Sequence, residues 1–219
     1  MKHYQVLSAL LLYPEPPLLA SLAELETALA DNPELQAPLR PLLSYLAKED
    51  LITLQECYVA TFDRNPSHSL HLFEHIHGES RDRGQAMVDL MEEYKRHGLE
   101  MTGNDLPDYV PLFLEFLSQL DAEEATRMLS DAVHVLAHIG RKLKANGSPY
   151  AVVFDVLQQL SPVVAEELSE PPVRDMDEAL ETFGPGIDGV EPLLKPGGCG
   201  TQPINFHPRG ARTAVSAAN

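Results

Sequence analysis

Apolar residues recur every three or four positions from residue 4 to residue 168, which is the spacing of one face of an α-helix. Polar residues, prolines and glycines interrupt this pattern at intervals of about one helix length. We find no segment of alternating β-branched residues that would indicate a strand. The pattern therefore predicts an all-α fold, a single globular helical bundle of about eight or more helices.

Residues that start or stop helices divide the pattern. Asp50, Ser80 and Asp121 each precede a periodic segment and can accept a hydrogen bond from the first turn of a helix. Pro38 and Pro41 are expected to break the pattern, so that only a short helix surrounds the leucines next to them. The predicted helices cover residues 4–12, 18–29, 39–46, 51–62, 68–77, 81–97, 107–120, 122–145, 149–160 and 162–168.

The composition changes after residue 169. Residues 170–219 contain seven of the 13 glycines and seven of the 18 prolines, with few aliphatic residues at helical spacing. Such segments cannot bury enough apolar surface to offset the entropy of ordering them. We therefore expect a helical domain over residues 1–169 and a flexible C-terminal tail over residues 170–219.

The charge balance narrows the possible partners. The chain has 16 basic and 33 acidic residues, a formal charge of −17. Nucleic-acid binding is excluded because phosphate contacts need a basic face, whereas the acidic excess favours solubility or a basic peptide partner. No apolar run approaches the ~20 residues of a membrane span. Cys57 and Cys199 form no CxxC motif, which suits a reducing cytoplasm.

The segment 58–87 mixes histidines, charges and aromatic residues. His68, His71 and His75 could share one side of a helix and bind a metal, but no HExxH motif or nearby cysteine supports this. We expect instead polar or titrating histidines, with no metal and no cofactor.

Arginines in the same segment need a negatively charged partner. Arg81 and Arg83 should face carboxylates such as Asp63 and Glu74, or else a bound anion, and both alternatives stay open. A nucleophile setting, a Walker loop and a GxGxxG motif are all missing from the sequence. The residues therefore give little support to a catalytic function.

A second polar and aromatic segment covers residues 104–116. We expect its carboxylates to form one wall of an acidic groove whose floor is Phe113 and Phe116. Such a groove fits a basic amphipathic helix. The predicted wall consists of Asp105, Asp108 and Glu115.

Three segments, YVATFDR at 58–64, SLHLFEHIHGESRDRG at 69–84 and LPDYVPLFLEF at 106–116, resemble the nitrate reductase delta-subunit family. These molybdenum cofactor assembly chaperones are a branch of the redox-enzyme maturation chaperones. Thr61 and Tyr109 depart from the family pattern, which usually has leucine and histidine there.

The resemblance implies an all-helical cytoplasmic chaperone without catalytic activity. It would bind the N-terminal peptide of the apo catalytic (alpha) subunit of nitrate reductase and hold it for molybdenum cofactor insertion. Molybdenum cofactor biosynthesis proteins are further candidate partners. The predicted peptide-binding residues are Tyr58, Phe62, Asp63, His71, Glu74, His75, Arg81, Arg83, Asp105, Asp108, Tyr109, Phe113, Glu115 and Phe116.

Two alternatives remain at this point. The first is a helical metal- or nucleotide-binding enzyme that uses the histidines and arginines of segment 58–87. The second is a structural subunit of the reductase, which would co-purify with the active complex.

Overall fold

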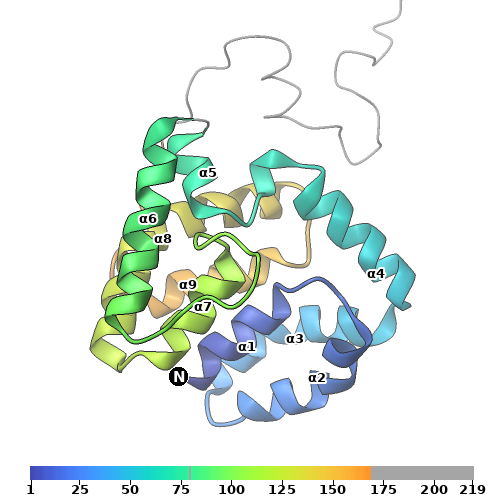
Figure 1. Ribbon diagram of the computed structural model, residues 1–219. Helices are drawn as coiled ribbons and strands as arrows, with labels where there is room; N and C mark the ends of the chain where they lie inside the picture. The colour runs from blue at the N-terminus through green and yellow to red at the C-terminus, as the bar shows by residue number, and fades with distance from the viewer. Residues whose placement is uncertain (79, 169–219) are drawn as a thin grey trace, which may run out of the picture.

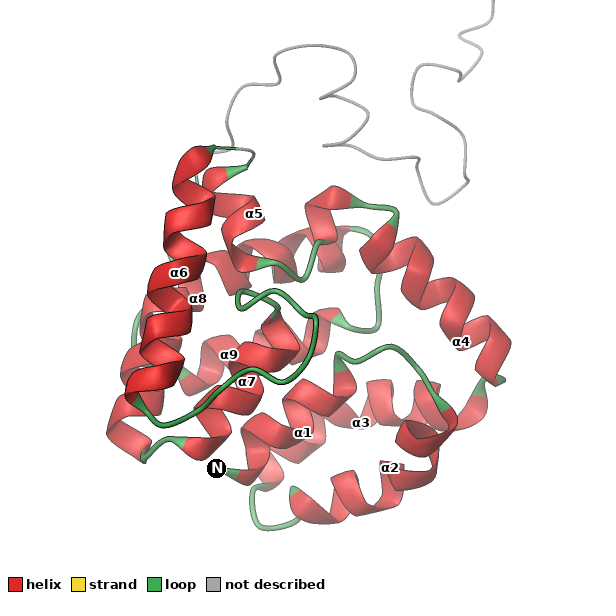
Figure 2. Ribbon diagram, in the orientation of Figure 1, coloured by secondary structure: helices red, strands yellow, loops and turns green. Residues whose placement is uncertain are grey.

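The computed structural model describes residues 1–78 and 80–168, and this part of the chain folds into nine α-helices without a strand (Figures 1 and 2). The predicted all-α class is confirmed. Residue Glu79 and the predicted tail 170–219 lie outside the described residues. The helices are α1 (Lys2–Leu10), α2 (Pro16–Ala28), α3 (Pro33–Lys48), α4 (Leu51–Tyr58), α5 (Leu72–His77), α6 (Arg81–Arg96), α7 (Val110–Gln119), α8 (Ala122–Ala145) and α9 (Ala151–Leu160).

Side-chain caps begin three of these helices as predicted. Asp50 accepts a hydrogen bond from the backbone N–H of Thr53 at 3.1 Å, and Asp121 accepts one from Glu124 at 2.9 Å. The hydroxyl of Ser80 caps α6 in the same way. These starts are confirmed because a cap depends only on residues within one helical turn.

The expected break at Pro38 and Pro41 is wrong. Both prolines lie inside α3, which runs without interruption from Pro33 to Lys48. A proline inside a helix costs roughly 3 kcal/mol, while burying a leucine side chain contributes about 1.5–3 kcal/mol. Leucine burial along one face of α3 therefore outweighs both prolines. The buried leucines are Leu39, Leu42, Leu43 and Leu46.

Two predicted helix starts are wrong for one shared reason. The helix expected from residue 68 begins at Leu72, and that expected from residue 107 begins at Val110. The residues before both helices are extended and pair with each other. The backbone N–H of Leu72 donates to the carbonyl of Asp108 at 3.0 Å, and that of Val110 donates to Leu70 at 2.8 Å.

The helix expected at residues 162–168 is also wrong, since this segment is not helical. Its backbone instead crosses the surface of α8, where the N–H of Glu166 donates to Nδ1 of His134 at 2.9 Å. A π-helical turn, η1 (Val59–Asp63), and a 3-10 turn, η2 (Pro66–His68), connect α4 to α5.

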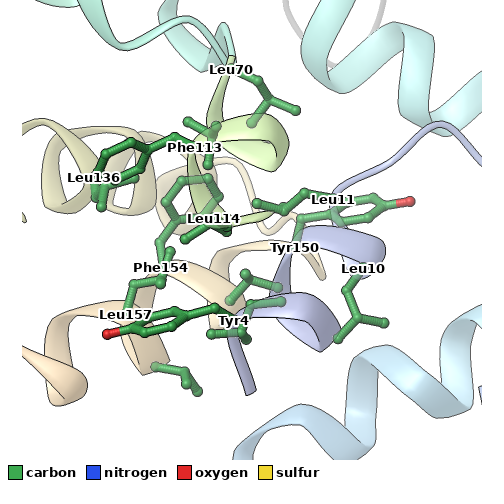
Figure 3. Packing of buried hydrophobic residues seen from close by; sticks show 14 of the residues in the cluster. Tyr4, Leu10, Leu11, Leu70, Phe113, Leu114, Leu136, Tyr150, Phe154 and Leu157 are labelled. Carbon is green, nitrogen blue, oxygen red and sulfur yellow. The ribbon is translucent and has the colours of Figure 1, made fainter. Parts of the chain in front are cut away.

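The core lies where α1, α7, α8, α9 and α3 pack in succession against one another. Tyr4 from α1, Leu114 from α7 and Phe154 from α9 are almost fully buried and point toward a common centre (Figure 3). No helix in residues 1–78 and 80–168 is both long enough and apolar enough to span a bilayer.

A close approach of α8 and α9 depends on Gly140. A Cβ atom at Gly140 would lie 2.7 Å from the Cβ of Phe154, far inside van der Waals contact. We expect Gly140→Ala to lower the free energy of unfolding by roughly 1–3 kcal/mol, measured in urea. Gly84→Ala is the matched control, because a Cβ atom added there would meet no atom within 4 Å apart from the neighbouring backbone of its own helix. It should raise stability by about 0.5–1 kcal/mol. Equal stability of both variants would contradict this packing.

Candidate functional site

The extended segments before α5 and before α7 pair with each other, and this pairing brings several predicted site residues together in front of α7. The loop that precedes α7 lies between α5 and α1 (Figure 1). His71 and Tyr109 form an isolated antiparallel bridge, and their rings lie 5.5 Å apart. The hydroxyl of Tyr109 lies 3.4 Å from that of Tyr58. Residues from α4, from the segment before α5 and from the loop before α7 thus meet at one place.

Asp108 anchors this meeting point. Its side chain is fully buried, at 0% exposure, and accepts hydrogen bonds from the N–H of Phe73 at 3.0 Å and from Nδ1 of His71 at 3.3 Å. Burial alone would raise the pKa of Asp108, but these hydrogen bonds and the charges of His71 and Arg83 lower it below its ordinary value. Asp108 is therefore ionised at neutral pH and joins the loop to the start of α5.

Tyr58 supports the other side of the site. Its buried hydroxyl donates to the carbonyl of Leu11 at 2.8 Å, and its ring packs edge-on against Tyr13 at 5.4 Å. Phe62 and Tyr150 pack on the same ring from inside. Desolvation raises the pKa of Tyr58, so the phenol stays neutral and acts as a hydrogen-bonding support.

Two carboxylates act on the phenol of Tyr109. Burial raises the pKa of Tyr109, and the negative charges of Asp105 and Asp63 raise it further. Both aspartates are exposed, and Tyr109 is half-buried. We define the Tyr109 surface as Tyr13, Asp63, His71, Asp105 and Tyr109. It combines accessible aromatic rings with negative charge.

The predicted groove with a phenylalanine floor is wrong. Phe113 and Phe116 are only 2% and 4% exposed, because the apolar face of α7 packs between α1 and α8. Phe116 contacts the ring of Tyr94 at 4.4 Å rather than solvent. Glu115 is exposed, whereas Asp108 is buried, so the two carboxylates do not line one wall.

His68 and His75 of segment 58–87 form hydrogen bonds within the protein. His68 uses Nδ1 toward the carbonyl of Thr61 at 3.0 Å and Nε2 toward Asn146 at 2.7 Å. His75 uses Nε2 toward the carbonyl of Ser69 at 2.8 Å. Burial lowers the pKa of both histidines. His68 lies outside α5, so the one-sided histidine face considered from the sequence does not form.

Arg83 has a carboxylate partner, whereas the two alternatives for Arg81 stay open. Arg83 is half-buried and faces Glu74 with Nη2 at 4.0 Å from Oε2, as the ion-pair interpretation predicted. Glu74 also accepts a hydrogen bond from Ser69 Oγ at 2.5 Å. Arg81 is exposed to solvent.

Sequence reasoning missed two parts of the molecule. Tyr13 is linked to the Tyr109 surface through its ring contact with Tyr58. A separate polar cluster around Glu93, His97 and Glu124 lies between α6 and α8. Both depend on contacts between segments far apart in the chain, which local patterns do not report.

Comparison with known proteins places these features in a family. The model of the nitrate reductase delta subunit family matches residues 28–156. The chain is 38% identical to the nitrate reductase molybdenum cofactor assembly chaperone NarJ of Escherichia coli (strain K12), covering 96% of this chain and 93% of that protein. It is 29% identical to the probable nitrate reductase molybdenum cofactor assembly chaperone NarJ of Bacillus subtilis (strain 168), covering 70% and 85%.

A solved structure shares the fold. It is that of a proposed redox enzyme maturation protein from Archaeoglobus fulgidus, with a TM-score of 0.56 and 20% sequence identity. The match covers 72% of this chain and 91% of that chain.

Proposed function

The chain belongs to the nitrate reductase delta subunit family, and we propose on that premise that it is an assembly chaperone for a nitrate reductase. It binds the catalytic (alpha) subunit before the molybdenum cofactor is inserted, through the N-terminal peptide of that subunit. The observation that carries this proposal is the 38% identity, over 96% of the chain, to a protein named as such a chaperone.

The Tyr109 surface is the proposed peptide site. Tyr13 and Tyr109 offer aromatic faces, and Asp63 and Asp105 add negative charge from two different segments. A peptide with basic and apolar residues gains from both, because apolar surface is buried while cations meet carboxylates. The formal charge of −17 attracts the same kind of peptide at longer range.

The other predicted residues have two proposed roles. Arg81 and Glu115 are exposed and can extend the contact surface, as can the half-buried Glu74, His75 and Arg83. Buried residues support the surface from below and do not contact the peptide. These supporting residues are Tyr58, Phe62, Asp108, Phe113 and Phe116.

The names of the relatives and the hydrogen bonds of the histidines favour a chaperone over an enzyme. The two relatives described above are named as molybdenum cofactor assembly chaperones. Both ring nitrogens of His68 are hydrogen-bonded within the protein, and His68 lies outside α5, so His68, His71 and His75 do not form one set of metal ligands for the enzyme alternative. The proposal places the chain in the cytoplasm, with cofactor biosynthesis proteins as further partners.

The molybdenum content of the catalytic subunit tests the proposal. We expect the catalytic subunit purified from cells that lack this chain to contain much less molybdenum than the subunit from wild-type cells. Returning the wild-type chain should restore the metal, which elemental analysis measures. Equal molybdenum content with and without the chain would contradict the chaperone role.

A further inference from the structure

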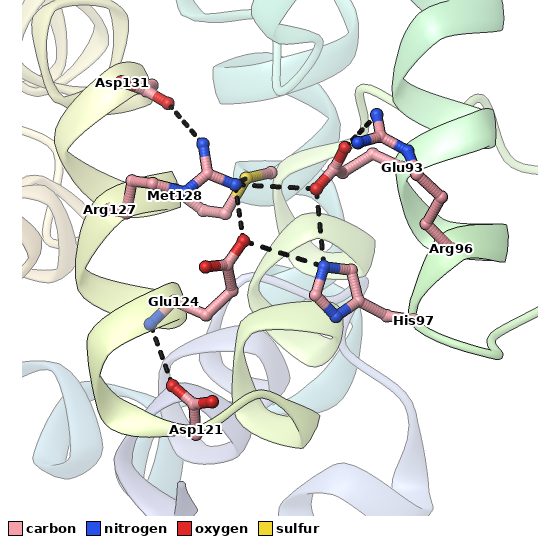
Figure 4. A network of polar contacts seen from close by, with 8 residues as sticks. All are labelled: Glu93, Arg96, His97, Asp121, Glu124, Arg127, Met128 and Asp131. Carbon is pink, nitrogen blue, oxygen red and sulfur yellow. Dashed lines mark hydrogen bonds and ion pairs between the residues drawn. The ribbon is translucent and has the colours of Figure 1, made fainter.

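The end of α6 and the start of α8 are joined by a cluster of metal-ligand side chains (Figure 4). Nε2 of His97 lies 3.4 Å from Oε1 of Glu93 and 3.7 Å from Oε1 of Glu124. The three donor atoms all lie within 4.8 Å of one another. Among the described residues, this is the group of three such side chains that converges on one point.

We propose that Glu93, His97 and Glu124 bind a divalent transition-metal ion such as Zn²⁺. Imidazole nitrogen and carboxylate oxygen bind zinc at about 2.0–2.2 Å, which places tetrahedral donors roughly 3.3–3.5 Å apart. Two of the donor distances in this cluster already have nearly that length. This site lies outside the Tyr109 surface and does not depend on the proposed peptide.

The donors are held in place before any metal arrives. Arg96 pairs with Oε2 of Glu93, which leaves Oε1 directed at His97. The ring of His97 packs edge-on against Phe116 at 5.6 Å, and this contact limits its rotation. Partners of this kind fix the orientation of metal ligands and lower the entropic cost of binding.

Arg127 supplies positive charge to the cluster when no metal is bound. Its Nη2 lies 2.5 Å from Oε1 of Glu124 and 3.5 Å from Oε1 of Glu93. The side chain is 52% exposed, and its Nη1 already lies 3.5 Å from Asp131. The guanidinium can therefore move toward Asp131 and leave both carboxylates to a metal. A bound metal and Arg127 compete for the same oxygens.

A cavity of about 280 Å³ lies beside two of the three proposed ligands, His97 and Glu124. The cavity leaves room for a water molecule or a small ligand to complete a four-coordinate ion. Tyr94 is the buried residue of α6, so this helix has little buried surface that attaches it to the bundle. A metal bound by Glu93, His97 and Glu124 would add a second attachment. The cavity is also lined by Leu99, Gln119, Leu120 and Asp121.

Zinc titration of the full chain, in competition with a chromophoric chelator, tests the site. We expect the wild type to bind Zn²⁺ at this site, and His97→Ala and Glu124→Gln to lose it. Arg127→Gln should bind about tenfold more tightly, because the competing cation is gone while both carboxylates remain. His77→Ala is the control, since it removes a histidine outside the cluster and should bind like the wild type.

Substitution of a ligand should weaken zinc binding, whereas substitution of Arg127 should strengthen it. Circular dichroism checks that each variant is folded. Zinc should also slow hydrogen exchange in α6 of the wild type but not of His97→Ala. A wild type that binds no Zn²⁺, equal binding by His97→Ala, or an Arg127→Gln variant that binds no more tightly would each overturn the site.

Discussion

Asp108→Ala is expected to lower the free energy of unfolding by roughly 3 kcal/mol, a large change for one substitution. Asp108 is fully buried and accepts hydrogen bonds from the N–H of Phe73 and from His71. Alanine would leave the N–H of Phe73 buried without a partner and remove the bond that joins the loop to α5. Urea unfolding at neutral pH measures the change.

Asp108→Asn, and the pH dependence of the free energy of unfolding, separate the contribution of the charge of Asp108 from that of its shape. Asparagine keeps an acceptor for Phe73, so we expect about half the loss seen with alanine. The pKa of Asp108 is lower in the folded protein than in the unfolded chain, where it is about 3.9. The ionised side chain therefore stabilises the fold above about pH 3.9, and this stabilisation is lost as the pH falls through the pKa of the folded state. The gap between wild type and Asp108→Ala should therefore shrink below about pH 4. A gap that is absent at pH 7, or constant down to pH 2, would refute the anchoring role.

Removing both exposed carboxylates of the Tyr109 surface is expected to weaken peptide binding about tenfold, or roughly 1.4 kcal/mol. Asp63→Asn with Asp105→Asn keeps the shape and removes the charge that a basic peptide would meet. Calorimetric titration with a synthetic N-terminal peptide of the cognate catalytic subunit measures the affinity. Added salt should weaken the wild type more than the variant, because only the wild type has these charges to screen.

The matched control removes two exposed carboxylates elsewhere. Asp31→Asn with Glu34→Gln makes the same change in net charge at the turn between α2 and α3. It should bind the peptide like the wild type. If the two double variants bind equally well, net charge rather than the Tyr109 surface governs recognition.

Local features of the fold could be predicted from the sequence. Asp50, Ser80 and Asp121 begin helices as expected, because each cap involves a neighbour within three residues. The prolines of α3 could not be judged in this way, because the burial that offsets them depends on other helices. The same limit applies to residues 162–168, which cross α8 instead of forming a helix.

The site was predicted in composition but not in geometry. The sequence pointed to residues 58–87 and 104–116, and the structure brings His71, Asp108 and Tyr109 from these segments together. The hydrogen bonds of Asp108 join residues at least 35 positions apart in the sequence, which no local pattern encodes. The sequence predicts Phe113 and Phe116 as the floor of a groove, because a sequence does not show which apolar face a neighbouring helix covers. The cluster of Glu93, His97 and Glu124 could not be predicted for the same reason, because it joins two helices.

Hydrogen–deuterium exchange of the chain with and without the N-terminal peptide shows whether the peptide binds at the Tyr109 surface. We expect slower exchange in residues 59–73 and 98–110, which carry most of the Tyr109 surface, with no metal or cofactor added. Exchange in the turn between α2 and α3, where the matched control substitutions lie, should not change. Unchanged exchange throughout, or protection confined to α6, would contradict peptide binding at this surface.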